Sequence, residues 1–138
     1  MTRKPNWPEL LPPFLAEKKD MPFDWQYNNC CFFASDWVRI LTGIDPATDL
    51  RAEITDLASA KKALLARGGV EQICEDRCAA NDWPEVAPNF AQRGDIATVD
   101  TPHGPAIGVV FGRDVAFAGK LGVEFFPISQ TRRAWRIC

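Results

Sequence analysis

The stretch CCFFASDWVRILTG, residues 30–43, decides the fold of this chain. Its large apolar side chains recur at the three- and four-residue spacing of an amphipathic helix: Phe33, Trp37, Ile40 and Leu41. Gly43 supplies the residue type that most often ends a helix in a left-handed conformation. We therefore predict a helix over residues 30–42, with one apolar face turned toward a core.

The predicted helix begins with two cysteines. A thiol at a helix N-terminus is favoured as thiolate, because the helix dipole and the free N–H groups stabilise the negative charge. Cys30 thus has the placement of a nucleophile; the alternative is a small, unreactive residue packed under a sheet. Cys31 lies one residue further around the helix and is expected to point into the core. The adjacent pair is not expected to form an ordinary disulfide, because the required geometry would strain it.

The pattern changes from helical to alternating along the chain. Two further helices are predicted at residues 57–67 and from residue 70 to about 78, separated by Gly68 and Gly69. Strands are expected at residues 96–99, 107–111, 115–118, 121–126 and 134–137, with the first two joined as a hairpin. Helices precede strands, so we predict an α+β fold with helices packed on a small antiparallel sheet.

The N-terminal segment differs in composition. Residues 1–24 contain five prolines, which favour a wrapping arm with at most two short helices, at residues 9–11 and 14–18. We therefore predict an arm over residues 1–24 and one α+β domain over residues 25–138. Exposed aromatic side chains in such arms often mark protein interfaces, which makes Trp7 and Phe14 candidate interface residues.

Composition excludes several classes of function. The chain has 138 residues and a net charge of −2, which gives no basic field for nucleic acid. No apolar run approaches a membrane span, and the first residues lack the apolar core of a signal peptide, so synthesis and folding in a cytoplasm are expected.

Five cysteines and a single histidine do not suggest a disulfide framework. Cys74 and Cys78 lie four residues apart on a predicted helix, and we interpret them as small buried apolar residues. A redox or metal role for this pair stays open as a third possibility, although a closed zinc site would need two further ligands. We expect no cofactor and no metal.

Residues 30–46, with Phe-Ala-Ser-Asp-Trp-Val and then Thr-Gly-Ile-Asp-Pro, resemble a family of small phage and prophage proteins of unassigned function. Members of that family are encoded among tail genes and in gene transfer agents. The resemblance extends to residues 93–96, 106–112 and 134–137. That family is in turn similar to NlpC-like peptidases, papain-type enzymes that cut peptide crosslinks of bacterial cell walls. The resemblance implies a papain-like, NlpC-type fold and a place in the virion tail, among other tail or hub proteins.

The same resemblance locates the catalytic positions. In NlpC-like enzymes the histidine base immediately precedes a Val-Gly-Ile-Tyr-like strand, so matching Gly108 places Ala106 where the base belongs. The group that orients the base would fall within residues 115–118, which carry no polar side chain. His103 lies three residues before Ala106, on the other face of the strand unless a bulge re-aims it; otherwise it is a solvated turn residue.

Two functions follow as expectations. The first is a tail-tip or hub component that keeps a degenerate peptidase scaffold without catalysis, since a nucleophile without a base has little catalytic use. The alternative is an active cysteine peptidase or amidase that cleaves peptidoglycan peptides during DNA entry. In that case Cys30 would be the nucleophile and His103 the base.

Overall fold

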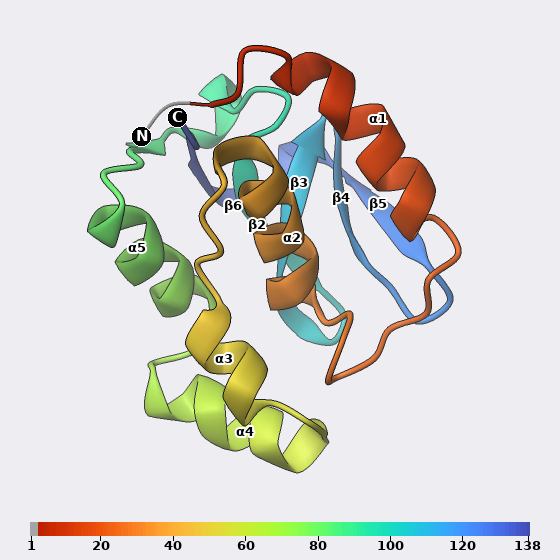
Figure 1. Cartoon of the computed structure of the whole chain (residues 1–138), viewed down its shortest axis with the longest axis vertical. Coiled ribbons are helices and arrows are strands. Elements are labelled where there is room, and N and C mark those ends of the chain that lie inside the picture. Colours follow the sequence, from red (N-terminus) through yellow and green to blue (C-terminus); the bar gives the residue numbers. More distant parts are fainter. Residues whose placement is uncertain (1–2) are drawn as a thin grey trace.

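The computed structural model describes residues 3–138, and within them the predicted α+β class is confirmed. The helices are α1 (Trp7–Lys18), α2 (Cys30–Thr42), α3 (Thr48–Glu53), α4 (Leu57–Ala66) and α5 (Val70–Ala80), with single 3₁₀ turns η1 (Pro88–Phe90) and η2 (Ile128–Gln130). The strands are β1 (Glu85–Val86), β2 (Ile96–Thr101), β3 (Gly104–Phe111), β4 (Asp114–Ala118), β5 (Val123–Pro127) and β6 (Thr131–Trp135). They form one antiparallel sheet in the order β1-β6-β2-β3-β4-β5, and Figure 1 shows α2 lying across its centre.

Helix α2 is the central element, and its predicted bounds are confirmed. Its apolar face, represented by Phe33, Trp37 and Leu41, is fully buried against the sheet. Burial of each such side chain stabilises the folded state by about 1.5–3 kcal/mol. Gly43 ends the helix with φ 84° and donates its N–H to Arg39 O at 2.8 Å, as the sequence predicts.

The sheet brings β3 and β4 into very close contact. A Cβ atom on Gly108 would lie 2.5 Å from Ala116 O and 2.6 Å from Val115 Cγ1, so this strand position admits only glycine. The sheet face away from α2 carries a second apolar cluster: Ala97, Val99, Ala106, Val110, Val115, Phe117 and Ala134. Ala91, next to η1, and Ile128 of η2 pack against this cluster.

The prediction for the helices of the N-terminal segment is wrong. Residues 7–18 form one helix with Pro12 and Pro13 inside it, instead of two short helices. Both prolines are exposed, so the carbonyl groups left without an N–H partner can be reached by water. Leu11 and Phe14 belong to the main core, so this helix packs on the rest of the chain, and the boundary at residue 24 stays a prediction. Residues 1 and 2 of the expected arm lie outside the described part.

Charged side chains fasten α1 and α3 to α2. Asp36 of α2 accepts from Lys18 Nζ at 2.6 Å and from Arg51 Nη2 at 2.7 Å, and Arg51 also pairs with Asp45 at 2.8 Å. Asp36 therefore has a structural role, since both of its carboxylate oxygens are engaged by the protein itself.

Within residues 3–138, the helices are all too short or too polar to cross a membrane.

Candidate functional site

The start of α2 is fixed by a buried asparagine. Asn29 is the N-cap: its Oδ1 accepts from the Phe32 N–H at 2.9 Å, and its Nδ2 donates to Trp25 O at 2.9 Å. These two bonds hold the incoming chain and the first turn together. Cys30 therefore enters the helix in a defined position, half-buried between the two apolar clusters.

The thiol of Cys30 is shifted toward the thiolate. The pKa of Cys30 is lowered from 9.0 to about 7, and the largest cause is a hydrogen bond from the Cys31 thiol, which acts against an opposing effect of burial. The backbone N–H groups of Ile107, Cys31 and Cys30 itself contribute the rest of this lowering. Cys30 is thus substantially ionised at neutral pH without a histidine.

Cys31 takes the opposite role. It is buried, as expected, and the neighbouring Cys30 together with burial raises the pKa of Cys31 well above its ordinary value. The proton shared by the two thiols therefore stays on Cys31, which acts as the donor of the pair.

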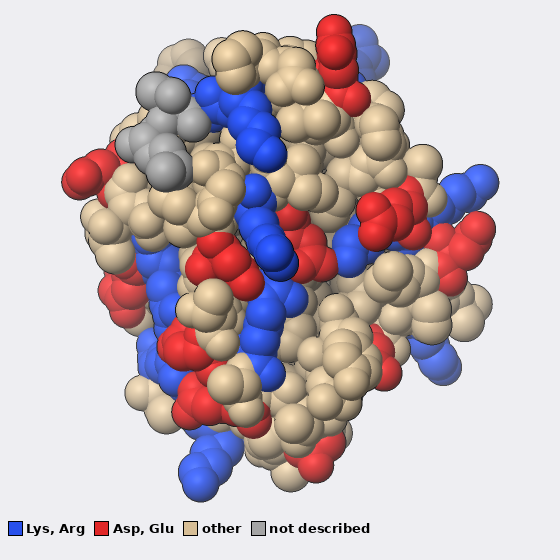
Figure 2. Space-filling view, viewed as in Figure 1, with Lys and Arg blue, Asp and Glu red and all other residues tan. Residues whose placement is uncertain are grey.

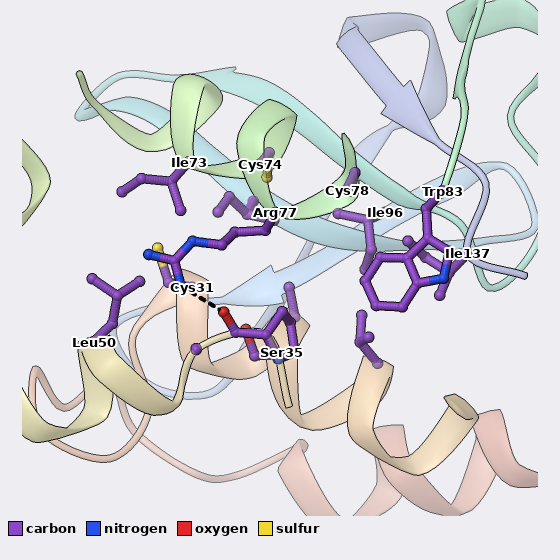
Figure 3. Close-up of a pocket in the computed structure, with 15 residues that line it drawn as sticks. Cys31, Ser35, Leu50, Ile73, Cys74, Arg77, Cys78, Trp83, Ile96 and Ile137 are labelled. Carbon is purple, nitrogen blue, oxygen red and sulfur yellow. Dashed lines mark hydrogen bonds between the residues drawn. The ribbon is translucent and has the colours of Figure 1, made fainter. Parts of the chain in front are cut away.

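A small cavity of about 50 Å³ lies behind Cys31, between α2 and α5. Figure 3 shows Cys31 approaching it from α2, and Cys74 and Cys78 from α5. Arg77 crosses one side and donates to Pro46 O at 2.9 Å. Burial raises the pKa of Cys78 to about 12 and that of Cys74 well above its ordinary value. Cys74 and Cys78 are thus buried, as the sequence predicts, and a role for the pair beyond packing stays untested.

The position assigned to the base is apolar. Ala106 is buried in the second cluster together with Phe117 of β4, and Cys30 packs against this same cluster. Residues 115–118 are all buried and apolar. This side of the thiol therefore presents carbon atoms, and neither side chain can accept a proton.

His103 lies at the tip of the β2–β3 hairpin. The turn of Pro102 and His103 is exposed, and its backbone is held by a bond from the His103 N–H to Thr101 Oγ1 at 3.1 Å. Within residues 3–138, no hydrogen bond joins the imidazole to Cys30. The structure therefore gives His103 the position of a solvated turn residue, one of the two alternatives that the sequence leaves open.

The expected interface residues anchor α1 to its own domain. Phe14 is 2% exposed and packs against Phe33 and Trp37, with ring centroids 5.3 and 5.6 Å apart. Trp7 is half-buried over Gly94, where an added Cβ would lie 2.9 Å from its ring. The expectation of an exposed Phe14 is therefore wrong, because helix formation turns this residue into the core.

Charge and metal-binding groups add no further site. Figure 2 shows positive and negative side chains interleaved over one face of the molecule. Ion pairs such as Arg77–Asp49 (2.6 Å) join neighbouring elements. Within residues 3–138, no group of three or more His, Cys, Asp or Glu side chains is arranged to hold a metal ion.

Sequence reasoning found Cys30 but missed two residues that define its environment. Asn29 carries a recognisable signal, because asparagine directly before a helix is a preferred N-cap. The donor role of Cys31 has no signal of its own beyond its adjacency to Cys30.

Comparison with known proteins identifies the family. The curated proteins contain no match to the chain. A family model described as a domain of unknown function (DUF6950) matches residues 2–137. Because this match covers nearly the whole chain, the protein belongs to the DUF6950 family.

Proposed function

We propose that this protein is a structural component of a phage or gene-transfer-agent tail, at the tail tip or hub, which keeps a papain-like, NlpC-type scaffold without its catalysis. It would be made in the host cytoplasm and incorporated into the virion beside other tail proteins. The tail assignment rests on the sequence resemblance of residues 30–46, 93–96, 106–112 and 134–137.

Two structural observations support the scaffold assignment. A cysteine begins a central helix, and that helix packs on β3 and β4 of an antiparallel sheet. The segment that would carry the histidine forms β3, directly beside the cysteine. Both are arrangements that a papain-type nucleophile and base require.

The observation that carries the proposed loss of catalysis is the apolar surface beside Cys30. Ala106 fills the position expected for the base, and buried apolar side chains fill residues 115–118, the segment expected to carry the group that orients it. The members of such a triad act together, and loss of one typically reduces the rate by several orders of magnitude. A thiolate that lacks a proton donor for the leaving amine cannot complete peptide hydrolysis efficiently.

Release of soluble peptides from purified peptidoglycan tests the catalytic part. We expect the wild-type protein and the Cys30→Ala variant to give the same background, measured by liquid chromatography and mass spectrometry. Release that the wild type produces and Cys30→Ala abolishes would overturn this part of the proposal.

Quantitative mass spectrometry of purified particles tests the assembly part. We expect the protein at a fixed ratio to the known tail proteins, resistant to salt washing. Its absence from purified particles would contradict a structural role, whatever the peptidase assay shows.

An active cysteine peptidase or amidase acting on peptidoglycan is the second candidate. The half-buried Cys30 with a pKa of about 7 favours it, because the nucleophile is already ionised. With His103 at the exposed hairpin tip, a partner protein would have to supply the proton donor. Activity that appears only when a tail partner is added, and that depends on Cys30, would support this candidate.

A further inference from the structure

Helix α4 turns two of its three leucines away from the protein. Its inner face packs through small side chains, Ala60 and Ala63, which are 0% and 4% exposed. On the outer face, Leu65 is 79% exposed and Leu57 is 46% exposed. A surface helix normally buries its leucines and exposes polar side chains, so α4 reverses the usual arrangement. An outer face of this kind commonly marks a binding surface.

The position of α4 leaves its outer face open. Among the described residues, α4 packs chiefly on α3, and Figure 1 shows it at one end of the longest axis of the molecule. The outer face therefore projects from the domain as a convex ridge. A partner can reach it without any rearrangement of the chain.

Two lysines border an apolar line on this ridge. Ala58 and Leu65 are seven residues apart, so they lie one above the other along the helix. Lys61 and Lys62 are each three or four residues from both, which places one lysine on either side of the line. We define the α4 face as the six exposed residues of this ridge: Leu57, Ala58, Lys61, Lys62, Leu65 and Ala66.

The charge of the α4 face has a single sign. Within residues 3–138, neither Lys61 nor Lys62 takes part in an ion pair. Acidic side chains before α4 are engaged by other groups, since Glu53 is paired with Arg67 and the carboxylate of Asp56 caps the start of α4. The α4 face thus carries two positive charges and favours an anionic partner.

The composition of the α4 face selects a lipid bilayer among anionic partners. The face contains only alanine, leucine and lysine, so the two ammonium groups are its side-chain hydrogen-bonding groups. A specific protein interface normally combines directional hydrogen bonds with aromatic or arginine anchors that fill pockets. A membrane surface needs neither, because leucines enter its apolar boundary while the lysine stems reach back to the headgroup phosphates.

We propose that the α4 face binds the surface of an anionic phospholipid bilayer, with α4 lying parallel to the bilayer plane. In the bound state Leu57 and Leu65 reach the boundary between headgroups and acyl chains, and Lys61 and Lys62 contact lipid phosphates. The inference rests on α3 and α4 alone, so it goes beyond the proposed tail function and does not depend on it.

Flotation of the full chain with lipid vesicles tests the proposal. We expect the wild type to bind vesicles made of equal parts of phosphatidylglycerol and phosphatidylcholine at low salt, and to be released as added salt screens the lysines. Vesicles of phosphatidylcholine alone should bind at least about tenfold more weakly, because each lysine near an anionic surface strengthens binding about fivefold.

A pair of double variants separates the α4 face from net charge. Lys61→Glu combined with Lys62→Glu should weaken binding to the anionic vesicles by at least about tenfold. Lys19→Glu combined with Lys120→Glu is the matched control, because it changes the net charge equally at two exposed lysines outside α4. The control should change binding about twofold at most.

A second pair of variants tests the apolar part of the α4 face. Leu65→Ser should weaken binding about tenfold, because the bilayer then gains one leucine fewer. Leu121→Ser is the matched control, since Leu121 is 84% exposed and lies outside α4. Binding of this control should equal that of the wild type.

Hydrogen exchange of the wild type gives a readout that needs no variant. Anionic vesicles should slow exchange in the peptide that contains α4 and leave the β5 peptide unchanged. Protection that appears elsewhere but not in α4, or equal weakening by both double variants, would overturn the proposal. A wild type that stays unbound with anionic vesicles at low salt would also overturn it, and would leave the α4 face to an acidic protein.

Discussion

Two pairs of cysteines lie on the two helices that face each other across the small cavity, and their thiols differ sharply. At the first turn of α2, the pKa of Cys30 is lowered to about 7, whereas in the interior of α5 the pKa of Cys78 is raised to about 12. Both pairs pack into the main core. The difference in pKa therefore comes from hydrogen-bond donors. Cys30 receives a hydrogen bond from the Cys31 thiol and lies beside the free N–H groups of the helix start, whereas the N–H groups in the interior of α5 are already bonded within the helix.

The contrast within the first pair is as informative. Cys31 also lies in the first turn of α2, yet its pKa is raised well above the ordinary value, chiefly by the ionised Cys30. Two adjacent thiols share one negative charge, because a second charge beside the first is costly in a poorly solvated place.

The largest expected effect is a difference in alkylation. At pH 7 about half of the Cys30 thiols but roughly one in 10⁵ of the Cys78 thiols would be ionised. Iodoacetamide labelling of the folded protein, followed by peptide mass spectrometry, should therefore modify Cys30 faster than Cys78 by at least three orders of magnitude. Exposed Cys138 serves as the reference for accessibility. Comparable alkylation rates at Cys30 and Cys78 would contradict the difference in pKa between the two thiols.

The same contrast should appear in stability as a function of pH. The folded pKa of Cys30 lies below its ordinary value of 9.0, so between pH 7 and 9 the unfolded chain binds more protons at this site and stability rises with pH. The contribution of Cys30 is complete above pH 9 and is lost as the pH falls through 7. In urea unfolding, the free energy of unfolding of the wild type should rise relative to that of Cys30→Ser between pH 7 and 9, by no more than about 1.4 kcal/mol per pH unit.

At Cys78 the dependence of stability on pH has the opposite sign. Its raised folded pKa means that its contribution is complete below pH 9 and is lost as the pH rises toward 12. The wild type should therefore lose stability relative to Cys78→Ala above pH 9. Parallel curves for the wild type and both variants would show that neither thiol is perturbed by folding.

Removing the donor thiol should make Cys30 less reactive. Cys31→Ala deletes the strongest contribution to the low pKa, so the midpoint of the alkylation profile should move upward and the rate at pH 7 should fall about tenfold. Cys31→Ser keeps a hydrogen-bond donor of similar size, so the alkylation rate of Cys30 at pH 7 should fall less in this variant. An unchanged profile in Cys31→Ala would assign the shift to the backbone alone.

The smallest expected effect concerns the cap. Asn29→Ala removes the bond to the Phe32 N–H and should lower the free energy of unfolding by about 1–2 kcal/mol, measured by urea denaturation. Asp56→Ala, at the exposed cap of α4, is the matched control and should lower it by a similar or smaller amount. Only Asn29→Ala should change the alkylation of Cys30, and an equal effect of both variants on Cys30 would contradict a local role of the cap.

Strong local patterns made much of this fold predictable. Helix α2 follows from its apolar spacing and Gly43, and the β2–β3 hairpin follows from alternation around a short turn. Two elements have no comparable signal. The six-residue α3 relies on Arg51 and on the pairing of Asp49 with Arg77, and the two-residue β1 relies on β6 for its hydrogen bonds.

The N-terminal segment was mispredicted because its local signal opposes the fold. Pro12 and Pro13 disfavour a helix, but burial of Leu11 and Phe14 on one face outweighs that preference. At the candidate site, the placement of Cys30 follows from sequence alone. Its charge state depends on how the thiol of Cys31 and the N–H of Ile107 are placed in space, and sequence spacing does not encode that geometry.

The pH profile of Cys30 alkylation, compared between the wild type and His103→Ala, tests the central claim most directly. A thiolate held by Cys31 and backbone N–H groups, beside an apolar base position, predicts a midpoint near pH 7 that is identical in both proteins. A midpoint that rises, with a rate at neutral pH that falls in His103→Ala, would reveal a thiolate–imidazole pair and would contradict the account of a scaffold without its base.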